Sequence, residues 1–201
     1  GNAAASSSAG GGGGASTTVA GGGGGGQPHA SADPHCANVK GESFDILTIG
    51  RLTMVQTPRF GPSAGRDLSV TALVRPISRR PCAPTVIKRV DVSGAWLGTR
   101  PVLSLSPGPE GVPALPAAWR RLAAGSGASQ GDVRLQVLRL FRSGQKMGFS
   151  LKVRGLLVEV KQRRGRNTGT DYLDMEVKGL ASLGARAGGL LGLDGHANET
   201  R

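Results

Sequence analysis

The sequence predicts an all-β protein, an antiparallel β-sandwich preceded by a segment without a fold of its own. Apolar and polar residues alternate with a period of two in short runs between residues 68 and 177, which is typical of strands that bury one face. Turn signals rich in Gly, Pro and Arg separate these runs. Many short strands at this spacing favour an antiparallel sandwich or barrel over a parallel α/β sheet.

The N-terminal part, residues 1–32, is a low-complexity segment of Gly, Ala and Ser without a Lys, Arg, Asp or Glu. Val19 is its only large aliphatic residue. Such a segment cannot bury enough surface to offset an ordering entropy of about 1–2 kcal/mol per residue. We therefore expect a disordered linker over residues 1–32 and one folded domain over residues 33–201. Because the chain begins with Gly1, we expect it to be a fragment or a processed product.

The expected strands follow one another along the second part of the chain. Their alternating runs are residues 68–74, 90–93, 133–137, 147–153 and 173–177. Arg154-Gly155 lies between the fourth of these runs and a further strand-like run, which predicts a tight hairpin. Helical spacing is confined to residues 115–124, where Pro116 suits the first turn of a short helix.

The chain is strongly basic and poor in aromatic residues. Its 25 Lys and Arg against 13 Asp and Glu give a formal net charge of +12. Few aromatic side chains are available to stack on bases, so a nucleic-acid partner is not favoured. No apolar run reaches the about 18 residues of a membrane-spanning helix. Because HExxH, GxSxG and phosphate-binding Gly-Lys-Ser/Thr sequences are missing, we expect no enzymatic activity and no cofactor.

The densest group of charges lies at residues 161–166. Its cations are Lys161, Arg163, Arg164 and Arg166. We expect these residues in a turn between two strands. They form either a surface for polyanions, namely anionic glycans, membrane headgroups or nucleic acid, or, as we favour, a solvated basic loop without a ligand.

The start of the predicted domain carries a motif. Asp33-Pro34-His35 is followed by five residues, Gly41, two residues and Phe44-Asp45. This spacing resembles the opening of the von Willebrand factor type D (VWD) domain family. Further segments resemble that family in the same order, namely residues 68–75, Cys82 with residues 85–98, residues 147–160 and the closing GGLLGLDG at 188–195.

The resemblance implies a β-sandwich and a non-enzymatic function. Domains of this family serve adhesion, matrix or mucus building and multimer assembly in extracellular proteins. We therefore expect an extracellular or cell-surface interaction module within a larger protein, with a protein or glycan partner. Polyanion binding by the basic cluster and self-cleavage at Asp33-Pro34 are the alternatives.

The chain departs from the family at the closing loop. Gly188 and Leu191 stand where the family has two cysteines, and Leu193 stands where it has an asparagine. The resemblance therefore does not extend to disulfide-linked multimers.

The family's calcium site uses the same loop and an aspartate whose position is occupied here by Lys40. A lysine repels Ca²⁺, which needs six to eight oxygen ligands. Asp194 and Asn198 remain as candidate ligands, and two are too few, so we favour an ordinary turn at Asp194-Gly195 over a calcium site.

The opening motif also suggests chemistry, because some proteins with Gly-Asp-Pro-His break their Asp-Pro bond without a protease. Asp33 would be the nucleophile, Pro34 the leaving group and His35 the acid. Ala32 precedes the motif here instead of glycine. We favour the alternative that Pro34 starts the first strand and His35 makes a local hydrogen bond.

The two cysteines of the chain, Cys36 and Cys82, allow a single disulfide. Cys82 stands where the resembled family has a bonded cysteine, and we expect the pair to be bonded, because an extracellular domain favours disulfides. Two buried thiols are the alternative. Asn198-Glu199-Thr200 is a glycosylation sequon that functions only in a secreted chain.

Overall fold

The computed structural model describes the folded part of the chain with gaps, and this part is mostly antiparallel β-structure. The described residues are 29–30, 35–62, 65–79, 83–98, 102–108, 114–117, 119–120, 129–130, 133–138, 148–164 and 170–194. Several predictions therefore lie outside them, those for residues 1–28, Asp33, Pro34, Cys82, Arg166 and Asn198. Within the described residues, no helix is long and apolar enough to cross a bilayer.

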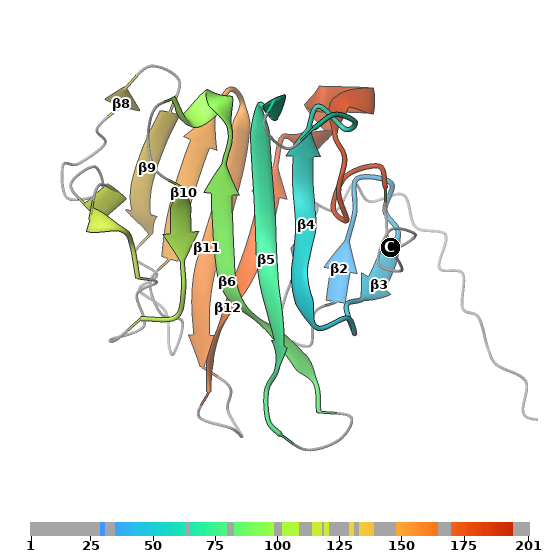
Figure 1. Cartoon of the computed structure of the whole chain (residues 1–201), viewed down its shortest axis with the longest axis vertical. Coiled ribbons are helices and arrows are strands. Elements are labelled where there is room, and N and C mark those ends of the chain that lie inside the picture. The colour runs from blue at the N-terminus through green and yellow to red at the C-terminus, as the bar shows by residue number, and fades with distance from the viewer. Residues whose placement is uncertain are drawn as a thin grey trace, which may run out of the picture.

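Four strands form the layer that faces the viewer in Figure 1. They are β4 (Gly50–Thr57), β5 (Leu68–Pro76), β6 (Thr85–Ser93) and β7 (Leu103–Leu105), each antiparallel to the next. A short 3-10 helix, η2 (Ala95–Leu97), follows β6.

A second set of eight antiparallel strands runs in the order β3-β2-β1-β12-β11-β10-β9-β8. Their bounds are His29–Ala30 (β1), His35–Ala37 (β2), Ser43–Asp45 (β3), Ser129–Gln130 (β8), Val133–Leu138 (β9), Gly148–Val153 (β10), Leu156–Arg164 (β11) and Asp171–Lys178 (β12). A 3-10 segment, η4 (Leu180–Arg186), follows β12. Strand β1 lies inside the range that the composition assigns to the linker.

The two sets are joined where β6 pairs with β12, at Ile87 and Leu173. Their apolar sides contribute to one core, as the alternation in the sequence predicts. The inward residues of β5, β6, β11 and β12 are at most 1 % exposed and include Val70, Ala72, Val74, Val90, Val92, Val158, Val160, Leu173, Met175 and Val177. Burial of these side chains is the main driving force for the fold.

The predicted hairpin at Arg154-Gly155 is confirmed. Strands β10 and β11 pair from Val153↔Leu156 outward, and the two turn residues have φ values of 45° and 82°. A two-residue turn with both φ values positive matches the right-handed twist of the flanking strands. At the predicted short helix, the N–H of Arg120 donates to the carbonyl of Pro116 (3.0 Å), and Trp119 is fully buried.

The junction between the two sets of strands gives a first prediction. Leu173→Ala removes a side chain that is 0 % exposed, and we expect it to lower the free energy of unfolding by about 2–5 kcal/mol. Leu47→Ala is the matched control, because Leu47 is 75 % exposed and its loss should change stability by less than about 0.5 kcal/mol. Urea unfolding measures both, and equal effects would show that the junction is not part of the core.

Candidate functional site

From His35 to Asp45, the opening motif folds as the hairpin β2–β3. His35 lies opposite Asp45 and Cys36 lies opposite Phe44, so the spacing of the motif is the spacing of two paired strands. In the turn, the side-chain oxygen of the buried Asn38 accepts the N–H groups of residues 40 and 42 (2.9 and 3.0 Å). Gly41 has a φ of 79°, which only glycine adopts readily.

His35 makes the local contact that we favoured over self-cleavage. Its Nδ1 bonds the Oδ1 of Asp45, the last residue of the motif, and both side chains are more than half exposed. The imidazole is therefore engaged across the hairpin. Asp33 and Pro34 lie outside the described residues, so self-cleavage stays an alternative supported by the motif alone.

Cys36 is 1 % exposed and belongs to the core. Its expected partner, Cys82, lies outside the described residues. The part of the chain that the structure describes contains no disulfide. The Cys36–Cys82 bond stays a prediction.

The closing loop lies along the edge of β4. Gly188 exchanges both backbone hydrogen bonds with Gln56 (2.9 and 3.0 Å), and the N–H groups of Leu190 and Leu191 donate to the carbonyls of Thr53 and Met54 (3.0 and 2.9 Å). The loop thus extends the pairing of β4 on the side away from β5. It also meets the opening hairpin, because the N–H of Val39 donates to the carbonyl of Leu191 (3.1 Å).

An ion pair that the sequence analysis did not find holds this loop. Asp194 Oδ1 accepts Arg59 Nε at 2.6 Å, and its Oδ2 accepts the N–H of Gly189 at 2.6 Å. A Cβ added at Gly188 would lie 2.9 Å from both Arg59 Cγ and Asp194 Oδ2. Glycine therefore fits at this position, where the resembled family has cysteine, because it leaves room for the pair.

This pair bears directly on the calcium hypothesis. The Asp194 side chain is only 7 % exposed, and each of its oxygens already has a donor. The Arg59 guanidinium neutralises the carboxylate and repels a divalent cation. Among the described residues, no three or more His, Cys, Asp and Glu side chains are grouped so as to hold a metal. The geometry at Asp194 therefore favours an ion pair with Arg59 over the binding of calcium. The other candidate ligand, Asn198, lies outside the described residues.

Three of the four cations of the basic cluster lie in a strand instead of the turn that we expected. Lys161, Arg163 and Arg164 belong to β11, because the alternation of the strand continues through the buried Gln162. Gln162 is fixed there by hydrogen bonds to the N–H and carbonyl of Gly108 (2.9 and 3.0 Å). The run of charges therefore begins within the strand and includes its last residue, Arg164.

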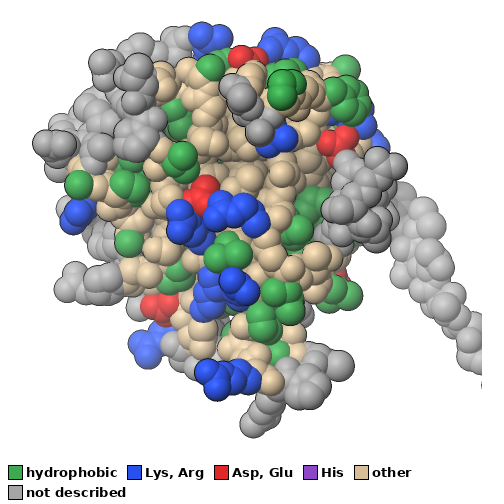
Figure 2. Space-filling model, in the orientation of Figure 1, with side chains coloured by type: hydrophobic (Ala, Val, Ile, Leu, Met, Phe, Trp, Pro, Cys, Tyr) green, Lys and Arg blue, Asp and Glu red, His purple; other side chains and the backbone are tan. Residues whose placement is uncertain are grey.

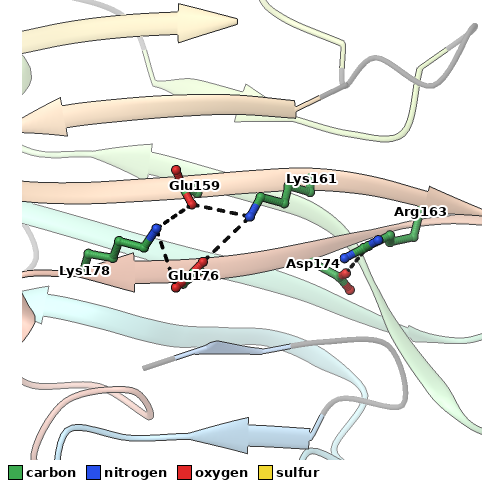
Figure 3. Close-up of polar contacts among 6 residues, drawn as sticks. All are labelled: Glu159, Lys161, Arg163, Asp174, Glu176 and Lys178. Carbon is green, nitrogen blue, oxygen red and sulfur yellow. Dashed lines mark hydrogen bonds and ion pairs between the residues drawn. The ribbon is translucent and has the colours of Figure 1, made fainter. Parts of the chain in front are cut away.

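Two of these cations belong to a ladder of charges across β11 and β12, shown in Figure 3. Glu159 contacts Lys178 (3.1 Å) and Lys161 (3.4 Å), and Glu176 lies 3.8 Å from both lysines. The third acid, Asp174, has a shorter contact with an arginine, since Arg163 Nε donates to one of its oxygens at 2.6 Å. We call these six residues the charge ladder, and its three cations face three carboxylates.

The contacts within the charge ladder shift the pKa values of two of its residues. Burial alone raises the pKa of Glu159, but the hydrogen bond from Lys178 and the charge of Lys161 outweigh it and leave that pKa lowered. The hydrogen bond from Glu159 raises the pKa of Lys178. Lys161 and Arg163 are thus compensated within the protein, whereas Arg164 is exposed at the end of β11 and Arg166 lies outside the described residues.

No family model and no curated protein matches this chain. The resemblance to the VWD family therefore rests on the motifs quoted above.

The ladder gives a prediction about pH. Since the pKa of Glu159 is lowered in the folded state, its contribution to stability is present above its unfolded pKa and is lost as the pH falls through the folded value. Glu159→Gln should lower the unfolding free energy at pH 7 by about 1–2 kcal/mol and flatten its decrease between about pH 5 and pH 3. Urea midpoints across that range measure it.

Glu176→Gln is the matched control for this experiment, because Glu176 makes only the two longer contacts of 3.8 Å. It should have less than half the effect at pH 7. An unchanged pH profile for Glu159→Gln would contradict the assignment of acid sensitivity to the ladder.

The closing loop gives a second prediction, on metals. Arg59→Gln leaves the mostly buried Asp194 without its cation, and we expect a loss of about 2–4 kcal/mol of stability. For the unchanged protein, Ca²⁺ and a chelator should give the same melting temperature. Arg186→Gln, which removes an exposed arginine paired with Asp67 (2.9 Å), is the control. Stabilisation of the unchanged protein by Ca²⁺ would overturn the assignment of Arg59 as the internal cation.

Proposed function

We propose that residues 33–201 form a VWD-like β-sandwich that serves as a non-enzymatic interaction module of an extracellular or cell-surface protein. The observation that carries the proposal is the contact between the opening hairpin and the closing loop, made by Val39 and Leu191. These two segments carry the motifs of the resemblance, and more than a hundred residues separate them in sequence.

Two further observations support the same proposal. The β4–β7 layer and the β9–β12 strands both contribute their apolar sides to one core, as the two sheets of a sandwich do. The spacing from His35 to Asp45 corresponds to a hairpin with a glycine at its positive-φ turn position. Adhesion and assembly, the functions that the resemblance implies, require surfaces and not a catalytic site.

Polyanion binding is the second candidate. The net charge of +12 favours it, but the charge ladder engages Lys161 and Arg163 with carboxylates. A polyanion surface is therefore better sought where cations outnumber carboxylates.

The proposed extracellular location predicts that the two cysteines are bonded to each other. Protein from its natural source, treated with an alkylating reagent without reduction, should be two hydrogens lighter than the reduced chain and should carry no alkyl group, because an oxidising compartment bonds Cys36 to Cys82. A glycan on Asn198, visible as added mass in the same spectrum, would be further support for an extracellular location. The reduced and alkylated protein is the control, and two alkylated thiols without a glycan would place the chain in a reducing compartment and contradict the proposal.

A further inference from the structure

The outer face of the β4–β7 layer carries a second group of cations. The strand register places Arg51, Leu73 and Arg89 in one row across β4, β5 and β6. Two residues after Leu73 on the same side of β5 is Arg75, which is exposed. Figure 2 views this face and shows Lys and Arg side chains along it with few acidic ones between them. We call Arg51, Arg75 and Arg89 the arginine face.

Two of these arginines are held by one carboxylate. Asp91 accepts Arg51 Nη1 on one oxygen (2.5 Å) and Arg89 Nε on the other (2.7 Å). Ser104, opposite Asp91 on β7, donates its hydroxyl to Asp91 (2.6 Å) and accepts Arg89 Nη2 (2.9 Å). The side chain of Asp91 is 8 % exposed, whereas those of Arg51 and Arg89 are 55 % and 45 % exposed. The carboxylate thus lies below two guanidinium groups that face solvent.

The carboxyl group of Asp91 remains ionised at neutral pH. Burial alone raises its pKa, but the hydrogen bonds from Ser104, Arg89 and Arg51 outweigh this effect and leave the pKa lowered. It therefore keeps orienting both guanidinium groups at neutral pH. Rigid donors lose less entropy when a ligand binds than mobile surface side chains do.

The balance of charge differs between the two faces of the molecule. The charge ladder has three cations for three carboxylates. The arginine face has three cations for the one carboxylate of Asp91, which is the only acidic residue in β4–β7. The remaining base of these strands, Lys88, is turned toward β12, where its Nζ donates to the carbonyl of Asp171 (2.5 Å).

The residues around the arginine face restrict the class of ligand that it can bind. No aromatic residue occurs in β4–β7, so bases have nothing to stack on there. Thr53 and Thr71 lie beside Asp91 and Ser104 in the neighbouring row and offer hydroxyl groups. Arg51 also forms part of a groove of about 390 Å³ between β4 and the closing loop, whose polar lining includes Thr53, Gln56 and Asp194, the last of which is paired with Arg59. A linear ligand that crosses the strands would continue from the arginines into this groove.

We propose that the arginine face binds a linear sulfated polysaccharide. Guanidinium groups form paired, charge-assisted hydrogen bonds with oxyanions, and sulfate esters spaced along a sugar chain would match arginines spaced across the strands. The threonine hydroxyls suit the hydroxyl groups of the sugars. This inference gives a partner class to the interaction module proposed above and rests on that function for its extracellular ligand, but the binding itself is testable on the purified chain.

The experiment measures binding of a size-defined heparin oligosaccharide by calorimetry. Arg51→Gln with Arg89→Gln should weaken it at least about tenfold, because two charge-assisted contacts are lost. Arg134→Gln with Lys152→Gln is the matched control. These two residues are exposed cross-strand neighbours on β9 and β10, and their loss removes the same charge, so affinity should fall less than about threefold. Fully desulfated heparin should bind the unchanged protein at least about tenfold more weakly.

Several outcomes would overturn the proposal. Equal losses in both double variants would mean that net charge alone attracts heparin, and unchanged binding in the first would place the site elsewhere. Tighter binding of duplex DNA or of phosphatidylserine vesicles than of heparin, lost in the first variant, would replace the polysaccharide by another polyanion.

Arg75→Gln keeps the test decisive if the first double variant does not fold, because no carboxylate of the described residues pairs with Arg75 and it is not part of the Asp91 network. It should weaken heparin binding about threefold, and an unchanged affinity would overturn the proposal. A negative result in the heparin-binding test does not change the result expected for the cysteines and the glycan, so the two proposals can fail separately.

Discussion

The structure depends on what covers the edge of β4. A strand at the end of a layer presents unpaired N–H and carbonyl groups, and buried backbone groups need partners. Residues 188–191 supply them to Thr53, Met54 and Gln56, and Leu191 is buried in the core at the same time. Because Leu191 also accepts a hydrogen bond from Val39, this short segment joins the opening hairpin, the edge of β4 and the end of the described chain.

The constraint on that edge explains the residues around it. The backbone of Gly189 passes so close to β4 that an added Cβ would lie 2.7 Å from the carbonyl oxygen of Met54, so a side chain there would separate the loop from the strand. Asp194 then fixes the loop through Gly189 and Arg59. An ion pair and close backbone pairing together hold this loop against β4.

The sequence predicted features that depend on neighbours in the chain and missed those that depend on distant ones. Alternation located β5, β6, β10 and β12, and Arg154-Gly155 located a hairpin, because period and turn chemistry are local. The prediction of a turn at residues 161–164 was wrong, because charged residues alternate with a buried position there, and the buried position is the polar Gln162. Arg59 with Asp194 and Arg51 with Asp91 are 135 and 40 residues apart. The closing loop along β4 brings the first pair together, and the register of β4, β5 and β6 brings the second together.

The same register decides what an excess of positive charge can do. In β11 and β12 the acidic and basic residues fall opposite or diagonal to each other, so the strand pairing that builds the sheet also neutralises its surface. In β4–β6 a single acidic residue lies beneath the arginines, so pairing organises the positive charge without cancelling it. A count of Lys and Arg along the sequence would favour β11 as the polyanion surface, whereas the register leaves the larger excess of cations on β4–β6. The density of charge in the sequence therefore does not reveal which cations are compensated, because that depends on the carboxylates within hydrogen-bonding distance.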